Sequence, residues 1–196
     1  MDSHEEPRLE PPGAGLPMLE LGIARVLFRL RRWTGSRDSF TGHFQRERAA
    51  IHQLVRAVDA AQARQRVLIT RVRGLEDSSR NWSVWMTLDH LRIVNGRMAE
   101  VIASLSRGKV PPGEASTAAV KPRPDVTAGV MADYEASCEA VLAAVAGAPR
   151  LKTPARFAHP WFGPLDASGW HALAGAHMGI HRVQLERILQ GLKAAL

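Results

Sequence analysis

Apolar residues recur at spacings of three and four along most of the chain, which is typical of amphipathic helices. Four long segments carry this pattern, at about residues 39–69, 82–105, 125–146 and 166–196, and a shorter one covers about 17–33. No run alternates between apolar and polar residues as a half-buried strand does. The sequence therefore predicts an all-α protein with four principal helices and an extra N-terminal helix.

The lengths of the connections predict how these helices are arranged. Short turns join antiparallel neighbours, whereas a linker of nearly twenty residues can travel the length of a bundle. Residues 106–124, with four prolines, form such a linker between the second and third principal helices. These two helices are therefore expected to run parallel, which gives a four-helix bundle of up-down-down-up topology.

The N-terminal part is expected to differ from the bundle. Residues 1–16 are acidic and rich in proline, without the features of a secretory signal, and are predicted to be disordered. The helix at 17–33 is short, basic and amphipathic, and its apolar side could pack on the domain, on a second subunit or on a membrane surface. We expect packing within the protein. The predicted division is residues 1–38 before the bundle and 39–196 for the bundle. The apolar side of the helix consists of Leu19, Ile23, Val26, Leu27 and Leu30.

Charge and composition narrow the classes of function. The 196 residues carry a formal net charge of +7, which makes nucleic acid a candidate partner. Local arginine density at residues 46–73 has no interleaved aromatics for stacking on bases, so nucleic acid is not expected as a partner. A membrane surface is not expected either, because the helix at 17–33 is expected to pack within the protein. A single cysteine, Cys138, excludes an internal disulfide, and no uninterrupted apolar run is long enough to cross a bilayer. We expect a cytoplasmic protein.

Three histidines are predicted to face the interior of the bundle. His177 and His181 are four residues apart, so a helix places them one turn apart on one face. Both fall within the apolar stripe of the last helix, and His90 falls within the stripe of the second principal helix. The spacing does not fix whether the three lie at one level.

Three imidazoles suit zinc, nickel, copper and ferrous iron, and they would leave a position open, as in catalytic metal sites. The alternative is that these histidines are hydrogen-bonded core residues, since pairs four residues apart also arise by chance. Other histidines are interpreted differently: His43 and His52 as structural or surface residues, His171 as facing elsewhere, and His159 as ordering a loop, with the alternative that it lines the mouth of a site.

Two stretches resemble a known family. The segment "NWSVWMTLDHLRIVNGRM" resembles the second helix of the DinB-like (DinB/YfiT) superfamily, and "HPWFGPLDASGWHALAGAHMGIHRVQLERIL" resembles its last helix and preceding loop. The resemblance covers about residues 39–196 and is closest to an uncharacterised branch with an HP-x-x-G loop before the last helix. It implies an up-down-down-up four-helix bundle. It also implies that the family's metal-binding histidine triad corresponds to His90, His177 and His181.

The resemblance also implies a class of activity. Characterised relatives suggest a metal-dependent transferase or hydrolase that acts on a small molecule, with a low-molecular-weight thiol as a candidate cofactor. Zinc, nickel or iron is the expected divalent ion, and a homodimer is expected. A different class remains open, namely a non-catalytic metal-binding or interaction bundle that acts through dimer or partner contacts.

Three further residues are candidates for contacting a substrate. Arg97 lies two turns after His90 on nearly the same helix face, where its guanidinium could bind a carboxylate or another anionic group. Trp85 and Trp161 could form walls of a pocket. The alternatives are that Arg97 extends into solvent and that both tryptophans serve in packing.

Overall fold

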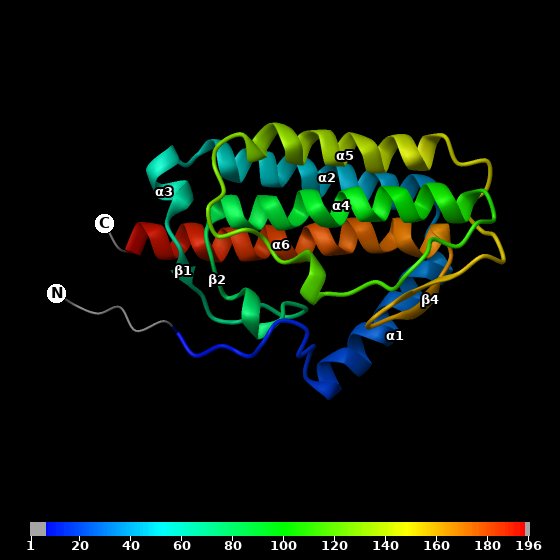
Figure 1. Cartoon of the computed structure of the whole chain (residues 1–196), viewed down its shortest axis with the longest axis horizontal. Coiled ribbons are helices and arrows are strands. Elements are labelled where there is room, and N and C mark those ends of the chain that lie inside the picture. The colour runs from blue at the N-terminus through cyan, green and yellow to red at the C-terminus, as the bar shows by residue number, and fades with distance from the viewer. Residues whose placement is uncertain (1–6, 195–196) are drawn as a thin grey trace.

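The computed structural model describes residues 7–194 and is dominated by helices (Figure 1). Within this range the α-helices are α1 (Met18–Thr34), α2 (Arg37–Arg56), α3 (Ala60–Arg64), α4 (Val84–Ser106), α5 (Val130–Ala146) and α6 (Ala167–Ala194). Two single 3₁₀ turns are η1 (Asp77–Ser79) and η2 (Ala118–Val120). The short strands are β1 (Val67–Leu68), β2 (Asn81–Trp82), β3 (Phe157–His159) and β4 (Gly163–Leu165).

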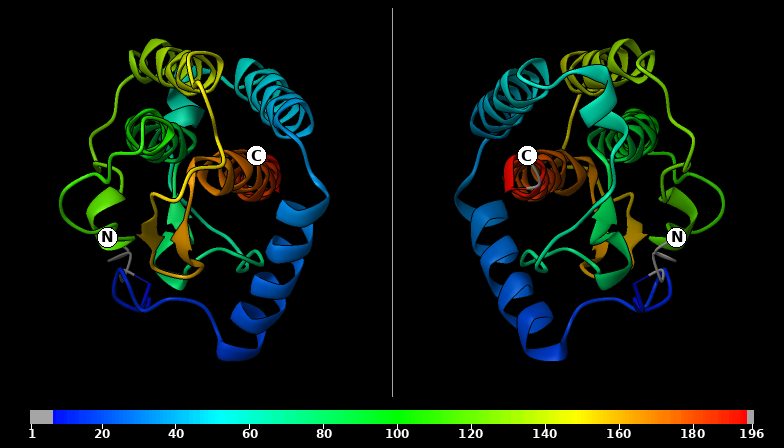
Figure 2. Two further views of the ribbon diagram at one scale, coloured as in Figure 1. Left: turned by 90° about the vertical axis from the view of Figure 1, so that its right-hand side faces the viewer. Right: turned by 90° about the vertical axis from the view of Figure 1, so that its left-hand side faces the viewer.

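The long helices α2, α4, α5 and α6 form a four-helix bundle, as the view along its axis shows (Figure 2). The colour gradient advances in the same direction along α4 and α5, and in the opposite direction along α2 and α6 (Figure 1). The topology is therefore up-down-down-up, as predicted. The linker between α4 and α5 returns along the outside of the bundle and carries η2 with it (Figure 1).

Two of the predicted helix starts are fixed by side-chain caps. Ser83 accepts a hydrogen bond from the backbone N–H of Met86 at the start of α4, and Asp166 accepts one from Gly169 at the start of α6. Both caps satisfy amides that have no partner within the helix. The start of α6 sets the positions of His177 and His181 along the bundle.

The predicted helix over 39–69 is wrong beyond Arg56, where α2 ends. Asp59 then accepts hydrogen bonds from the amides of Ala61 and Gln62, which starts the separate short helix α3. After α3 the chain is extended, and β1 pairs antiparallel with β2. The expectation of no strands is also wrong in detail. Strands of two or three residues were missed because they are too short to show an alternating pattern. The third principal helix begins at Val130 rather than near 125.

The N-terminal segment lies against the bundle. Of the residues predicted to be disordered, 1–6 lie outside the described part of the chain. Residues 7–16 contain no helix or strand, yet Glu10 and Gly13 donate backbone hydrogen bonds to the carboxylates of Asp77 and Glu76. These bonds hold the segment beside η1.

The expected packing of the apolar side of α1 within the protein is wrong. Phe28 is the residue of α1 that is buried, and it packs on Phe162 with 4.5 Å between ring centroids. Leu19 and Val26 on the other side are 79% and 64% exposed. The reason is that the arginines of α1 have partners on the bundle, so its polar side faces inward.

No helix within residues 7–194 is both long and apolar enough to cross a membrane.

Candidate metal centre

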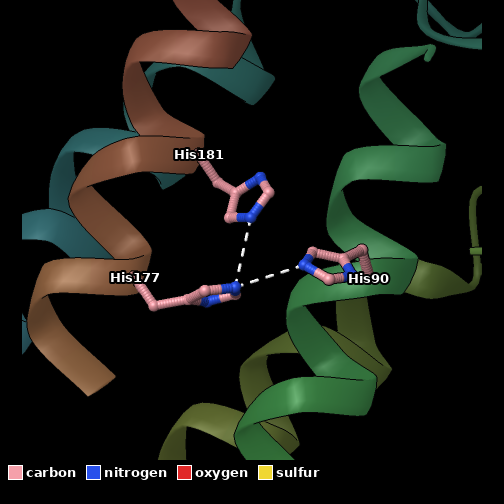
Figure 3. A group of neighbouring side chains, drawn as sticks. All are labelled: His90, His177 and His181. Atoms are coloured by element: carbon pink, nitrogen blue, oxygen red, sulfur yellow. Dashed lines mark hydrogen bonds between the residues drawn. The ribbon is translucent and has the colours of Figure 1, made fainter. Parts of the chain in front are cut away.

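Three imidazoles from two helices meet inside the bundle (Figure 3). His90 lies on α4, and His177 and His181 lie one turn apart on α6. The Nε2 atom of His177 is 3.2 Å from the Nε2 atom of His90 and 3.2 Å from that of His181. The packing of α4 on α6 thus brings to one level the three residues that the helical patterns predicted to face inward.

Hydrogen bonds determine which ring nitrogen carries the proton in two of the three imidazoles. The Nδ1 atom of His90 lies 2.7 Å from the carbonyl oxygen of Val120, which can only accept. The Nδ1 atom of His181 lies 2.6 Å from Oε1 of Gln184, and the Nε2 amide of Gln184 donates to the carbonyl of Ser79 at 2.7 Å. Both Nδ1 atoms therefore donate, and in the neutral rings the lone pairs on Nε2 face the centre of the cluster.

The third imidazole is held differently. His177 is partly exposed, whereas His90 and His181 are 6% and 3% exposed. Its Nδ1 atom is buried and has no hydrogen-bond partner among the described residues. The side of the cluster at His177 is therefore its more open side.

The surroundings favour uncharged imidazoles. Burial, opposed by the hydrogen bond to Val120 and assisted by the positive charge of Lys121, lowers the pKa of His90 to about 4. Burial also holds the pKa values of His177 and His181 well below the ordinary range, and the neighbouring histidines add to this effect. Neutral imidazole is the form that binds a metal ion.

A polar network outside the histidines holds the hydrogen-bond acceptors in place. Lys121, next to Val120 in the linker, donates to the carboxylate of Glu76 at 2.6 Å and to the hydroxyl of Ser79 at 3.0 Å. Glu76 is 4% exposed, so this ion pair is well shielded from water. The network joins the linker to the η1 turn and through Ser79 to Gln184.

Trp82 closes one side of the cluster. Its ring lies 5.1 Å from that of His90 and 6.1 Å from that of His181, with an interplanar angle of 5° to the latter. The Nζ atom of Lys121 lies 5.6 Å from the centre of the same indole. This wall of the site was missed from the sequence, although Trp82 begins the segment that contains His90.

The three candidate substrate residues do not gather at the histidines. Arg97 is at the surface with its side chain 73% exposed, and it donates to Glu100. Trp85 is buried, and the guanidinium of Arg64 lies over its ring. Trp161 lies in the turn between β3 and β4, where its amide donates to Nδ1 of His159.

Two of the remaining histidines, His171 and His159, have structural contacts. His171 is fully buried beside Thr41 and Phe40, with Oγ1 of Thr41 3.2 Å from its Nε2 atom. His159 packs on Phe162 and orders the turn, as expected, and Gly163 completes the turn with a φ of 68° that favours glycine. A surface depression of about 690 Å³ lies elsewhere on α6, is lined by Arg71, Ala176 and Arg182 among others, and includes none of the three clustered histidines.

Comparison with known proteins identifies the family of this chain. The model of the DinB superfamily matches residues 43–185, a range that contains all three clustered histidines. The chain belongs to the DinB superfamily. Among solved structures, this DinB-superfamily chain is similar to TT2238, described as a four-helix bundle protein, with 24% sequence identity and a TM-score of 0.56. The match covers 77% of this chain and 98% of TT2238, and it supports the fold. A comparison with curated proteins found no match.

We expect the metal-free protein to lose stability as the pH falls from 6.5 towards 4. A histidine in the unfolded chain titrates near pH 6.5, whereas His90 in the folded protein titrates at about 4. Between these values the unfolded state binds a proton that the folded state excludes. The free energy of unfolding is therefore highest above the unfolded pKa and declines as the pH is lowered. For His90 the difference is on the order of 3 kcal/mol.

Urea unfolding across this pH range, in the presence of a chelator, measures the effect. The His90→Gln variant should show a weaker dependence on pH than the parent chain, because one of the excluded protons is removed. An unfolding midpoint of the parent that does not change between pH 6.5 and 4 would contradict the expectation.

Proposed function

We propose that this DinB-superfamily protein holds one divalent metal ion through His90, His177 and His181, and that the centre serves a transfer or hydrolysis reaction on a small molecule. The observation that carries the proposal is the fixed orientation of His90 and His181. Val120 and Gln184 accept their Nδ1 protons, so two Nε2 lone pairs are directed at the same point beside Nε2 of His177.

The donor set fits a first-row divalent ion. Nitrogens bound to one zinc ion at 2.0–2.1 Å lie roughly 3.3 Å apart in a tetrahedral shell, and the two Nε2 separations of 3.2 Å are close to this value. Imidazole ligands suit zinc, nickel and iron, and all three ions remain candidates. In the metal-free protein a proton on Nε2 of His177 can donate to a facing lone pair across these contacts, whereas a divalent ion would accept all three Nε2 lone pairs at once.

Three protein ligands do not complete the shell of any of these ions, so a position is left for water or a substrate group. A bound divalent ion supplies Lewis acidity and lowers the pKa of a water or thiol at that position. In this proposal the histidines hold the ion, while Trp82 and the buried Glu76–Lys121 pair exclude water on one side. The partly exposed His177 marks the side from which a small molecule would approach.

A non-catalytic metal-binding bundle is the second candidate function. It is favoured by the positions of Arg97, Trp85 and Trp161, which supply no substrate contacts beside the histidines. In that function the metal would stabilise the contact between α4 and α6, and the protein would act through its partners. The two candidates differ in whether an added ligand reaches the metal.

We expect the purified protein to contain about one divalent metal ion per chain, measured by elemental analysis. Replacement of either histidine on α6, as His177→Ala or His181→Ala, should abolish stoichiometric binding because only two ligands remain. His52→Ala on α2, outside the cluster, is the control and should retain the metal. A parent chain that binds no ion after incubation with zinc, nickel or ferrous iron would contradict the proposal.

The open position is tested with the cobalt-substituted protein. We expect a low-molecular-weight thiol such as 2-mercaptoethanol to change the visible absorption of bound Co²⁺, because a thiolate ligand alters its spectrum. Ethanol at the same concentration is the matched control. A spectrum that neither thiols nor small anions change would favour the non-catalytic function over the transferase or hydrolase.

Gln184 should control metal affinity without touching the metal. Gln184→Leu removes the acceptor that orients His181 and is expected to lower affinity about 10–100-fold, measured by competition with a chelator. Gln190→Leu, an exposed glutamine on the same helix, is the matched control. Circular dichroism verifies that both variants are folded. An unchanged affinity in folded Gln184→Leu would show that this hydrogen bond does not orient the ligand.

A further inference from the structure

α1 is attached to the bundle by its polar side. Its arginine side chains reach three separate elements, with Arg31 donating to Nδ1 of His43 at 2.7 Å and Arg25 to the carbonyl of Trp161 at 2.7 Å. Arg32 pairs with Asp166 at the start of α6. At the other end of the helix, Glu20 accepts from the amide of Gly74 and from Arg71. These bonds fix α1 beside α6 at the edge of the bundle, as both end views show (Figure 2).

The opposite side of α1 is apolar and exposed, and we call it the outer face. It presents seven large hydrophobic side chains that are all more than half exposed: Met18 91%, Leu19 79%, Ile23 53%, Val26 64%, Leu27 60%, Leu30 52% and Trp33 83%. Arg25 and Arg29 are exposed at its margin, and Arg25 donates to the carbonyl of Trp161. Exposed apolar patches of this size mark interaction sites.

The order of residues on the outer face fits another helix. Leu19, Ile23, Val26, Leu30 and Trp33 follow one another at spacings of four, three, four and three. This is the a/d spacing of a helix whose seam packs side by side with a second helix. Because α1 is already folded and held by the bundle, such packing costs little further loss of backbone freedom.

We propose that the outer face of α1 is an interface with a second copy of this chain, formed by α1 against α1. At roughly 100 Å² for each large apolar side chain, the seven residues offer on the order of 700 Å² per protomer. A standard stable interface buries about 800 Å² per partner. An apolar face with almost no charge is also self-complementary, which a two-fold symmetric contact requires.

A lipid bilayer fits the outer face less well. Surface-bound amphipathic helices use lysines and arginines on their polar side to attract anionic headgroups. In α1 these arginines are engaged by the carboxylate of Asp166, the ring of His43 and the carbonyl of Trp161. The seam spacing and the occupied arginines together favour a protein helix as the partner.

Sedimentation equilibrium of the full chain tests the proposal. We expect a dimer, and we expect Leu19→Glu combined with Val26→Glu to raise the dissociation constant at least ~100-fold, because two charges enter an apolar seam. Both residues are mostly exposed, so circular dichroism and metal content should stay as in the parent. Val110→Glu, which changes an exposed apolar residue outside α1, is the matched control and should remain dimeric.

Cross-linking locates the contact. Cys138 is buried and should not react with a maleimide. Val26→Cys then provides an accessible thiol on the outer face, and a short bis-maleimide should link two chains through it. Val110→Cys should not be linked. A parent chain that is monomeric at all concentrations, or a dimer that the double substitution leaves intact, would overturn the proposal. Binding of a monomeric parent to anionic phosphatidylserine vesicles, lost in the double variant, would overturn it in favour of a membrane surface.

Discussion

The burial of three imidazoles against one another between α4 and α6 is the constraint on which the candidate site depends. The rings of His90 and His181 point their lone pairs inward and are neutral, and their outward N–H groups need acceptors. Val120 supplies one acceptor and Gln184 the other. Val120 lies in the linker, and Gln184 donates to the carbonyl of Ser79 in η1, so the linker and the η1 turn are parts of the site. The long linker therefore serves two purposes, since it permits parallel α4 and α5 and also brings a carbonyl to His90.

The three clustered histidines could be predicted because their signal is local. Each histidine falls within the apolar stripe of its own helix, and a helix of known period fixes which side a residue faces. The level at which α4 and α6 meet could not be predicted, since no local pattern records the register of two helices far apart in the sequence. Arg97 illustrates the limit: it shares a face with His90, but seven residues along a helix amount to about 10 Å. Sharing a face is therefore not the same as sharing a site.

The supporting residues were harder to predict for a different reason. The contribution of Val120 is a backbone carbonyl, which every residue has, so the side chain gives no indication of the role. Glu76 and Lys121 are common residue types, and their pairing depends on how the linker folds back over η1. Gln184 did carry a signal, because it lies three residues after His181, where a helix brings its side chain beside the ring. The error over residues 39–69 arose because α2 ends at Arg56 and the side chain of Asp59 then caps a separate helix, α3.

The amphipathic pattern of α1 was evident from the sequence, but the pattern identifies two sides without stating which one faces the bundle. Apolar burial is the usual outcome, and here specific partners reverse it: Asp166 and the turn at Trp161 bind arginines that would otherwise face water. α1 precedes the part of the chain that matches the DinB superfamily. None of the hydrogen bonds among residues 7–194 joins α1 to the three clustered histidines or to Gln184. The polar network that orients the imidazoles is therefore complete without α1, and the outer face can change its partner while the geometry of the candidate metal centre is preserved.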